Sequence, residues 1–246
     1  MLRYERKYLV PYILLDSMRK RFLPFVRPDE YALKAGNTLP QYTVRSIYLD
    51  TRNLECHTEK VEGVELRKKF RIRSYNDYSP EADTVFEIKR KIENRIKKHR
   101  AFTEFKHVLP LMQTSDVEKF IHKEENDRGL KDAKRFFYHV KKRFMQPTVL
   151  VIYEREAYHG LIDDGVRITF DKNIRSSIYP KYNELFNNHG LKHLFPSHFI
   201  LEIKYYTDRM PIWAKSIIQE FRLRNDALSK YAIGYDVNTK HNIFTY

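Results

Sequence analysis

The chain has 246 residues, which suits one large domain or two small ones, and its 42% hydrophobic content provides enough material for a core and argues against disorder. A net charge of +14 indicates a polyanionic partner, and nucleic acid, an anionic membrane surface and a phosphate polymer all fit that description. Only 7 residues are glycine and no glycine-rich phosphate loop is present, so any phosphate must be bound by side chains.

A single cysteine, Cys56, excludes an internal disulfide and a cysteine-rich metal site, and it favours a reducing compartment. The N-terminal residues lack the apolar segment of a signal peptide, and no stretch approaches the ~18 apolar residues that cross a membrane. We therefore expect a cytoplasmic protein without a membrane span.

The first half of the chain is predicted to begin with a strand, LRYERKYLV, followed by a helix between Pro11 and Pro24. YTVRSIYLDT is the second predicted strand, and a short helix follows it. The next two strands cover residues 65–75 and 84–91. A polar turn joins them, so they are predicted to form an antiparallel hairpin.

The middle of the chain is predicted to be helical, because Ser115 and Glu118 have the spacing of a capping box. Strands resume after Pro147 with TVLVIYEREAY and VRITFD, and an irregular stretch covers residues 179–196. The strand FILEIKYY and a final helix that begins at Pro211 complete the chain. No linker separates the two halves, so we expect one domain over residues 1–246.

Five of the predicted strands carry charged residues at every second position. In KKFRIRSY, for example, Lys69, Arg71 and Arg73 alternate with apolar residues. The other alternating sets are Glu87, Lys89 and Lys91; Tyr153 and Arg155; Arg167, Thr169 and Asp171; and Glu202 and Lys204. Because side chains alternate across a pleated strand, each set projects from one face. One such strand is most often an exposed basic surface. Five together predict a barrel with a basic interior, an apolar exterior covered by helices, and anionic contents.

These segments together resemble the VTC-type polyphosphate polymerase domain of the triphosphate tunnel metalloenzyme superfamily. YERKY, SIYLDT, RKKFRIRSY and FEIKRK are similar to its first half, and YEREAY, VRITFD, LEIKY and SKYAIG to its second. The resemblance covers roughly Arg3 to Gly234. It implies an α+β fold in which an eight-stranded antiparallel barrel surrounds a charged tunnel, with helices packed outside and a C-terminal helix closing one end.

The resemblance also implies roles for individual residues. The positions matched to catalytic, triphosphate-binding bases are Lys7, Arg71, Arg73, Lys89, Arg155, Arg167 and Lys204. Further phosphate contacts are expected from Lys69, Lys91, Lys98, Arg100, Tyr153 and Lys230. Glu202 matches a metal-binding glutamate, with Glu5 and Asp171 as additional candidates. The superfamily's N-terminal acidic motif is incomplete, because Arg3 stands at its first position.

The acidic residues also have purely structural interpretations. A lone acid among bases, such as Glu202, is often only a salt-bridge partner. Asp171 is equally suited to orienting an arginine and to binding metal. His57 stands where the family often has an aromatic residue, and no role is assigned to it.

The resemblance implies an enzyme that transfers the γ-phosphate of ATP to a growing polyphosphate chain with Mn²⁺ or Mg²⁺. An inorganic triphosphatase of the same fold is one alternative, although the shortage of acids near the first strand leaves few candidates for the base that activates water. A non-catalytic polyanion-binding protein is another. The basic strands lack the aromatic pair of RNA-binding sheets, so no nucleic acid is expected. The sequence does not determine the oligomeric state.

Overall fold

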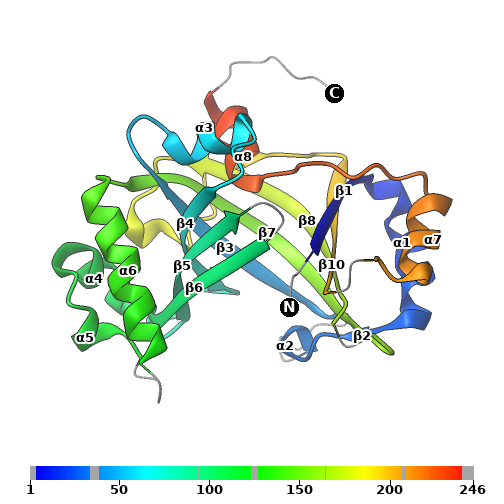
Figure 1. Ribbon diagram of the computed structural model, residues 1–246, viewed down its shortest axis with the longest axis horizontal. Helices are drawn as coiled ribbons and strands as arrows, with labels where there is room; N and C mark the ends of the chain where they lie inside the picture. The colour runs from blue at the N-terminus through cyan, green and yellow to red at the C-terminus, as the bar shows by residue number, and fades with distance from the viewer. Residues whose placement is uncertain are drawn as a thin grey trace. The chain divides into compact units, whose positions relative to one another are not determined.

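The computed structural model describes residues 4–33, 39–92, 95–122, 127–163, 165–206 and 209–239. Its strands form one antiparallel sheet in the order β1-β10-β8-β7-β3-β4-β5-β6, with β2 beside β7 and β9 beside β8 (Figure 1). The strands are β1 Tyr4–Pro11, β2 Val26–Pro28, β3 Gln41–Asp50, β4 Arg67–Tyr75, β5 Asp83–Ile92, β6 Arg95–Glu104, β7 Gln146–Gly160, β8 Arg167–Ile178, β9 Lys192–His193 and β10 His198–Tyr205.

Helices α1 to α6 lie between strands in the chain, and α7 and α8 follow β10. They are α1 Leu15–Phe22, α2 Glu30–Leu33, α3 Glu55–Val61, α4 Val108–Thr114, α5 Val117–Phe120, α6 Arg128–Lys142, α7 Ile212–Glu220 and α8 Lys230–Thr239. No helix within the described ranges is long and apolar enough to cross a membrane. The cytoplasmic location stays a prediction.

The predicted capping box was wrong. Ser115 does not start a helix; it ends α4 with a left-handed backbone (φ 59°). Asp116 caps α5 instead, because its side chain accepts a hydrogen bond from the backbone N–H of Lys119. The predicted helical middle section, which starts at Ser115, is divided into α5 and α6, and α4 precedes it without having been predicted. The predicted final helix is divided into α7 and α8.

The predicted eight-stranded closed barrel is not confirmed. The sheet has ten strands, of which eight lie on its main path and β2 and β9 are short additions. β1 and β6 are the two ends of that path, so the sheet is unclosed across the part of the chain that is described. Several lysine and arginine residues lie on β6, as is typical of an unpaired edge strand. The tunnel, and its closure by α8, stay predictions.

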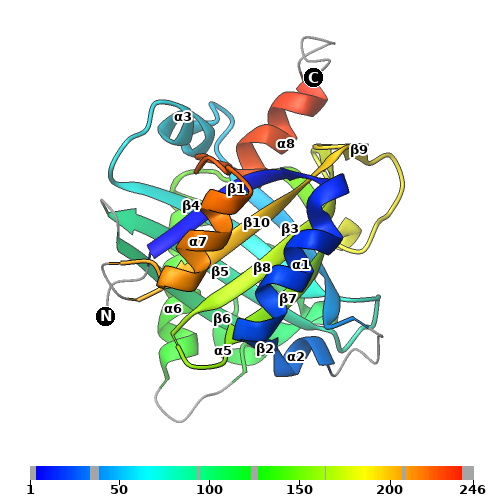
Figure 2. The same ribbon diagram turned by 90° about the vertical axis from the view of Figure 1, so that its right-hand side faces the viewer.

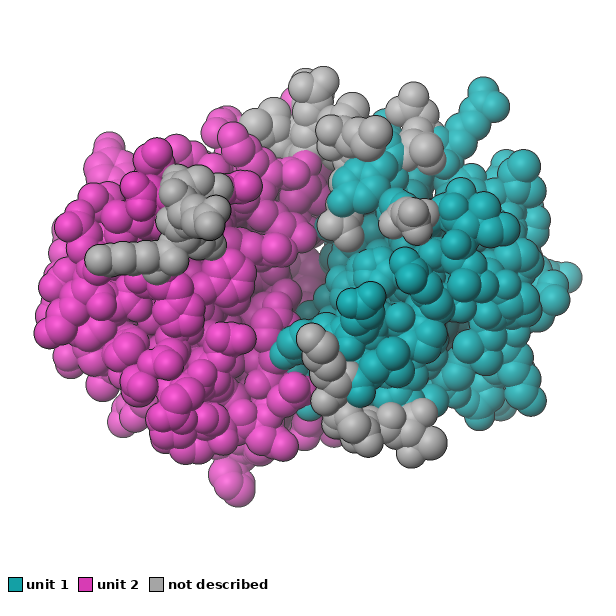
Figure 3. All heavy atoms as spheres, turned by 90° about the horizontal axis from the view of Figure 1, so that it is seen from below, with its two compact units in different colours: residues 1–43, 153–174, 195–228 teal, residues 44–152, 175–194, 229–246 magenta. Residues whose placement is uncertain are grey.

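The chain divides into two units (Figure 3). Unit 1 contains residues 1–43, 153–174 and 195–228, and unit 2 contains residues 44–152, 175–194 and 229–246. The strands β3, β7 and β8 contribute residues to both. The single domain over residues 1–246 stays a prediction, and each unit is described below by itself.

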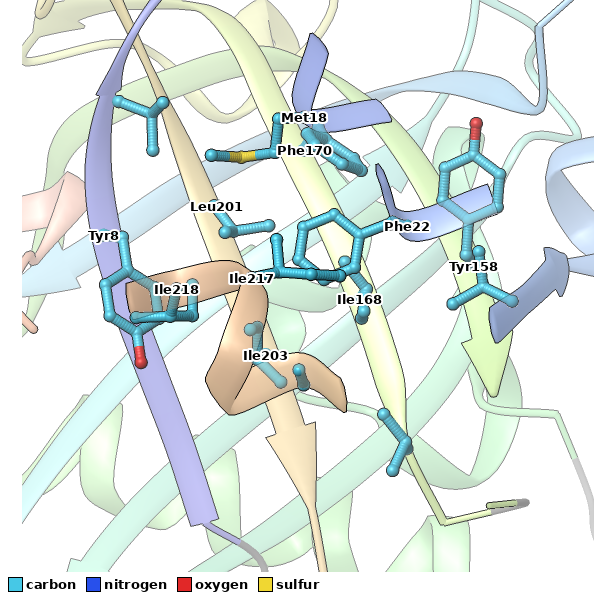
Figure 4. Close-up of a cluster of buried hydrophobic side chains, with 14 of the residues drawn as sticks. Tyr8, Met18, Phe22, Tyr158, Ile168, Phe170, Leu201, Ile203, Ile217 and Ile218 are labelled. Carbon is cyan, nitrogen blue, oxygen red and sulfur yellow. The ribbon is translucent and has the colours of Figure 1, made fainter. Parts of the chain in front are cut away.

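The core of unit 1 lies between its strands and the helices α1 and α7, which cover them in Figure 2. Alternate residues of β8 and β10, such as Phe170 and Leu201, face these helices and are fully buried. Phe22 of α1 packs edge-on against Phe170, with ring centroids 6.0 Å apart (Figure 4). The prediction of an apolar, helix-covered face is therefore confirmed for this unit.

In unit 2 the helix α6 covers the hairpin of β4 and β5. Phe70 of β4 and Phe86 of β5 are buried, and both rings contact Phe136 of α6. Asp132 of α6 also accepts a hydrogen bond at 2.7 Å from the ring of His99 on β6, which fixes the helix to the sheet. The alternate positions of the same strands face away from α6 and carry the charges.

Candidate phosphate-binding faces

The charged positions of unit 1 lie in rows across β1, β10 and β8. Cross-strand pairing gives the rows Lys7–Glu202–Thr169 and Glu5–Lys204–Arg167. Directly opposed side chains on one face of a sheet lie within reach of one another. The predicted site residues found in this unit are Glu5, Lys7, Tyr153, Arg155, Arg167, Asp171, Glu202 and Lys204.

Glu202 is 4% exposed and lies among three cations. Its carboxylate is 2.7 Å from Lys204 Nζ, and the shortest approaches of Arg155 and Lys7 are 3.6 and 3.8 Å. Burial lowers the pKa of Lys204 to about 7, although the neighbouring Glu202 opposes that change. These contacts fit the alternative in which Glu202 is a salt-bridge partner.

Arg155 and Asp171 form a second buried pair in unit 1. The guanidinium donates through Nε and Nη2 to the two carboxylate oxygens at 2.7 and 2.8 Å, and Asp171 is fully buried. Burial alone would lower the pKa of Arg155, but Asp171 raises it well above its ordinary value. The guanidinium also lies 5.2 Å from the ring centre of Tyr153. These contacts fit the alternative in which Asp171 orients an arginine.

Arg167 is held by two residues that the sequence analysis did not select. Its Nη2 donates to Asp29 at 2.9 Å and to the hydroxyl of Tyr42 at 3.0 Å. Burial raises the pKa of Asp29, but Arg167 and then His159 outweigh it, so the pKa is lowered. Asp29 precedes a short helix far away in sequence, and no local pattern connects it with β8.

The charged face of unit 2 is built on β3, β4, β5 and β6. Its longest row is Tyr48–Arg71–Glu87–Arg100, and the next is Lys69–Lys89–Lys98. The predicted site residues of this unit are Lys69, Arg71, Arg73, Lys89, Lys91, Lys98, Arg100 and Lys230. The structure therefore divides the predicted site residues between the two units.

Glu87 is the buried centre of the longer row and was missed as a site residue. It is 2% exposed, it bonds Arg71, and its other oxygen accepts from Arg100 Nε at 2.9 Å. Burial would raise the pKa of this carboxyl, but Arg71, Arg73 and their basic neighbours hold it well below its usual range. Its alternation with Lys89 and Lys91 was the available signal.

Three lysines lie opposite one another in the second row, and a serine binds one of them. Lys69 Nζ donates a hydrogen bond to Ser229 Oγ at 2.8 Å. Ser229 directly precedes Lys230, the first residue of α8. Lys89 is the cross-strand partner of both Lys69 and Lys98. Like charges on directly opposed side chains of a sheet destabilise it, so the three amines repel one another. An anion between these amines would relieve that repulsion.

Comparison of the sequence with models of protein families gives a match to the VTC domain over residues 2–238. The chain belongs to the VTC domain family. The matched range confirms the family resemblance predicted from roughly Arg3 to Gly234.

Two solved structures are similar to this VTC domain over nearly the whole chain. A Hippeastrum protein, described as a putative adenylyl cyclase with a dominant triphosphatase activity, has 13% identity and a TM-score of 0.50, covering 98% of this chain and 98% of its own. A protein from Pyrococcus horikoshii has 11% identity and a TM-score of 0.45, covering 94% and 97%. At such identity the likeness to the Hippeastrum protein shows a shared fold. Comparison with curated protein sequences found no match.

A divalent cation fits the acidic residues of this VTC domain only with additional ligands. Within the described ranges, no three His, Cys, Asp or Glu side chains are grouped as a metal site. Glu202 and Asp171 both contact Arg155, and Glu5 lies opposite Lys204 across the strands. Mg²⁺ is commonly bound by one or two carboxylates together with substrate phosphates. Glu202 therefore suits a cation that arrives with its phosphate ligands.

Proposed function

We propose that this VTC-domain protein is a polyphosphate polymerase that transfers the γ-phosphate of ATP to the end of a polyphosphate chain, using Mn²⁺ or Mg²⁺. Family membership and the cationic faces support this proposal. One observation favours phosphate transfer over hydrolysis, namely that the buried carboxylates of the two faces are bound by cations. Glu87, Asp171 and Glu202 are each bound by arginine or lysine.

The arginines and lysines have different roles in the proposed site. Arg71, Arg155 and Arg167 offer planar forks that bind two phosphate oxygens at once, and carboxylates already orient each fork. The Lys69 and Lys89 amines are point charges on flexible stems. On the charged face of unit 2, a polymer would be oriented by Arg71 and would advance past Lys69 and Lys89.

Phosphoryl transfer depends mainly on positioning and on electrostatic stabilisation of the transferred group. The terminal phosphate of the acceptor is already an anion, so no base is required. A water nucleophile requires one, but the pKa of Glu87 is held low and Asp171 is bound by both its oxygens. Glu202 would hold the metal ion, with Glu5 and Asp171 as weaker candidates, and the ion would offset charge on the phosphate oxygens.

A triphosphatase is the second candidate, and one observation favours it. Lys204 is buried beside Glu202, and its pKa is lowered to about 7. Near neutral pH a fraction of Lys204 is therefore unprotonated and able to accept a proton from water. A polyanion-binding protein without catalysis is the third candidate.

One experiment separates these candidates. Purified protein is incubated with ATP and Mn²⁺ or Mg²⁺, and the products are resolved on a gel. A ladder of lengthening phosphate chains supports the polymerase, orthophosphate alone supports the triphosphatase, and neither product supports the binding protein.

Substitutions connect the result with the proposed residues. Replacing Arg71 and Arg73 together with alanine should abolish either reaction, and Glu202→Gln should abolish metal-dependent turnover. Lys141→Ala with Lys142→Ala is the matched control, because it removes two exposed positive charges from α6 in the same unit as the arginine pair. Full activity in the Arg71 and Arg73 variant would contradict the proposed site.

A further inference from the structure

Helix α8 is joined to β3 and α3 through the buried carboxylate of Asp50. Its oxygens accept hydrogen bonds at 2.9 Å from the backbone N–H groups of Cys56 and His57 in the first turn of α3. The hydroxyl of Tyr231, in the first turn of α8, donates to the same carboxylate. The Tyr231 ring stacks on Tyr48 of β3, with centroids 5.3 Å apart. The SIYLDT and SKYAIG segments therefore meet in unit 2.

His57 makes the second connection between the helices. Its Nε2 lies 3.0 Å from Oδ1 of Asp236, five residues after Tyr231 along α8. The imidazole also contacts the Tyr235 ring at a centroid distance of 5.3 Å. The His57 side chain is 15% exposed and that of Asp236 is 30% exposed. Two contacts more than one helical turn apart fix both the position and the rotation of α8.

The other side of α8 packs closely on the strands of unit 2. A Cβ atom at Gly234 would approach Ser176 of β8 and Val149 of β7 to 3.2 Å, so glycine allows the short distance. Asn238 donates to Ser176 Oγ at 2.8 Å one turn later. Because the strands limit α8 on this side, the His57–Asp236 contact, together with the Tyr231–Asp50 hydrogen bond, holds the helix on the α3 side.

The start of α8 carries groups that belong to the proposed phosphate site. Ser229 is 4% exposed and accepts the hydrogen bond of Lys69, and Lys230 is the first residue of the helix. Lys230 follows Ser229 directly in the chain, so both residues move with the start of α8. Any shift of α8 therefore displaces both groups from the lysine row.

We infer that His57 is a positioning residue, which acts through Asp236 to seat α8 so that Ser229 and Lys230 bind the phosphate chain together with Lys69. The inference rests on the proposed function for its ligand. The geometry of the connection between α3 and α8 is independent of that function.

The test compares His57→Leu, which removes the contact with Asp236, and His57→Gln, which keeps a side-chain N–H donor. In His57→Leu, the α8 amides should exchange hydrogen faster, and the dissociation constant of tripolyphosphate should rise about three- to tenfold, as expected for one lost hydrogen bond. The KM of the polymerase reaction should rise by a similar factor with little change in kcat, because the loss is one of binding. His57→Gln should restore most of each value. His189→Leu, at an exposed histidine of the same unit, should change nothing.

Three outcomes overturn the inference. Unchanged exchange of the α8 amides in His57→Leu would show that His57 does not seat the helix. Faster exchange with unchanged tripolyphosphate affinity would show that α8 does not contribute to the phosphate site. Failure of the proposed function is recognised separately, because the unmodified protein would then neither form a phosphate ladder nor bind tripolyphosphate. That result would exclude a phosphate-binding role for α8, and the hydrogen-exchange data would still decide whether His57 seats the helix.

Discussion

Replacing Glu87 with glutamine should destabilise the protein and at the same time strengthen its binding of phosphate. Glu87 is the buried carboxylate between Arg71 and Arg100, and the substitution keeps its shape while removing its charge. The two arginines then lose their shared counterion. The folded protein without phosphate must carry that uncompensated charge, whereas a bound phosphate chain supplies a replacement.

The expected loss of unfolding free energy comes mainly from Arg71. Arg100 Nε lies 2.9 Å from Glu87, which corresponds to about 6 kcal/mol at an effective dielectric of 20. The Arg100 side chain is 47% exposed, however, so solvent screens most of this energy. The Arg71 side chain is 12% exposed, and removing one partner of a buried pair costs about 3–5 kcal/mol. Because glutamine keeps an oxygen acceptor, we expect about 3 kcal/mol.

The pH dependence of this loss follows from the lowered pKa of Glu87. A carboxyl whose folded pKa is below its unfolded value contributes its full stabilisation above the unfolded pKa, about 4.3, and loses it as the pH falls through the folded pKa. The difference in stability between Glu87→Gln and the unmodified protein should therefore be constant near neutral pH and should decrease below about pH 4.

Urea unfolding with and without tripolyphosphate measures both effects. A ligand bound only by the folded state stabilises it by about 2.7 kcal/mol at 100 times its dissociation constant. Each tenfold tightening of binding in the variant should therefore add about 1.4 kcal/mol to that gain. Glu65→Gln, at an exposed carboxylate of the same unit, is the matched control. Equal stability of Glu87→Gln and the unmodified protein, or an equal gain from tripolyphosphate in both, would refute the reasoning.

Further predictions concern three buried side chains, those of Tyr48, Phe170 and Arg155. Tyr48 should titrate at about pH 8, because the rise in its pKa caused by burial is smaller than the fall caused by Arg71 and the neighbouring cations. The absorbance of tyrosinate measures this titration, and the signal should be lost in Tyr48→Phe. Bound tripolyphosphate should move the titration to higher pH. Because the folded pKa is lowered, Tyr48 should stabilise the fold increasingly between pH 8 and 10. Phe170→Ala should cost about 3–5 kcal/mol in urea unfolding. Arg155→Lys should cost about 1.5–3 kcal/mol in the same assay, because lysine cannot bind both oxygens of Asp171.

The alternation of charged and apolar residues predicted the faces of the sheet well. Phe70 and Phe86 lie under α6, and Arg71 and Glu87 lie on the opposite face, because a strand's period of two leaves no other choice. The hairpin of β4 and β5 was likewise predicted from the polar turn between them. Local pattern was sufficient wherever one face of a strand had to be buried.

The partners of the predicted site residues were not predictable in the same way. Asp29 reaches Arg167 from 138 positions away in sequence, and Asp50 meets Tyr231 across 181 positions. Such contacts depend on which strands become neighbours and in which register, and alternation within one strand contains neither fact. Family resemblance supplied the cationic residues together with Glu202 and Asp171, but not Glu87 or Asp29, which hold Arg71 and Arg167. Closure of the barrel was an expectation of the same kind, and the sheet path from β1 to β6 does not bear it out.

The buried carboxylates give the two kinds of cation different freedom. Glu87 and Asp171 each fix an arginine before any ligand arrives, and this preorganisation lowers the entropy that binding must offset. In the second row of unit 2, Lys69 lies directly opposite Lys89. A phosphate chain that enters between these lysines relieves their mutual repulsion, whereas at Arg71 it must compete with Glu87. Under the proposed function, this difference allows a growing chain on the face of unit 2 to be oriented by Arg71 and released step by step along Lys69 and Lys89.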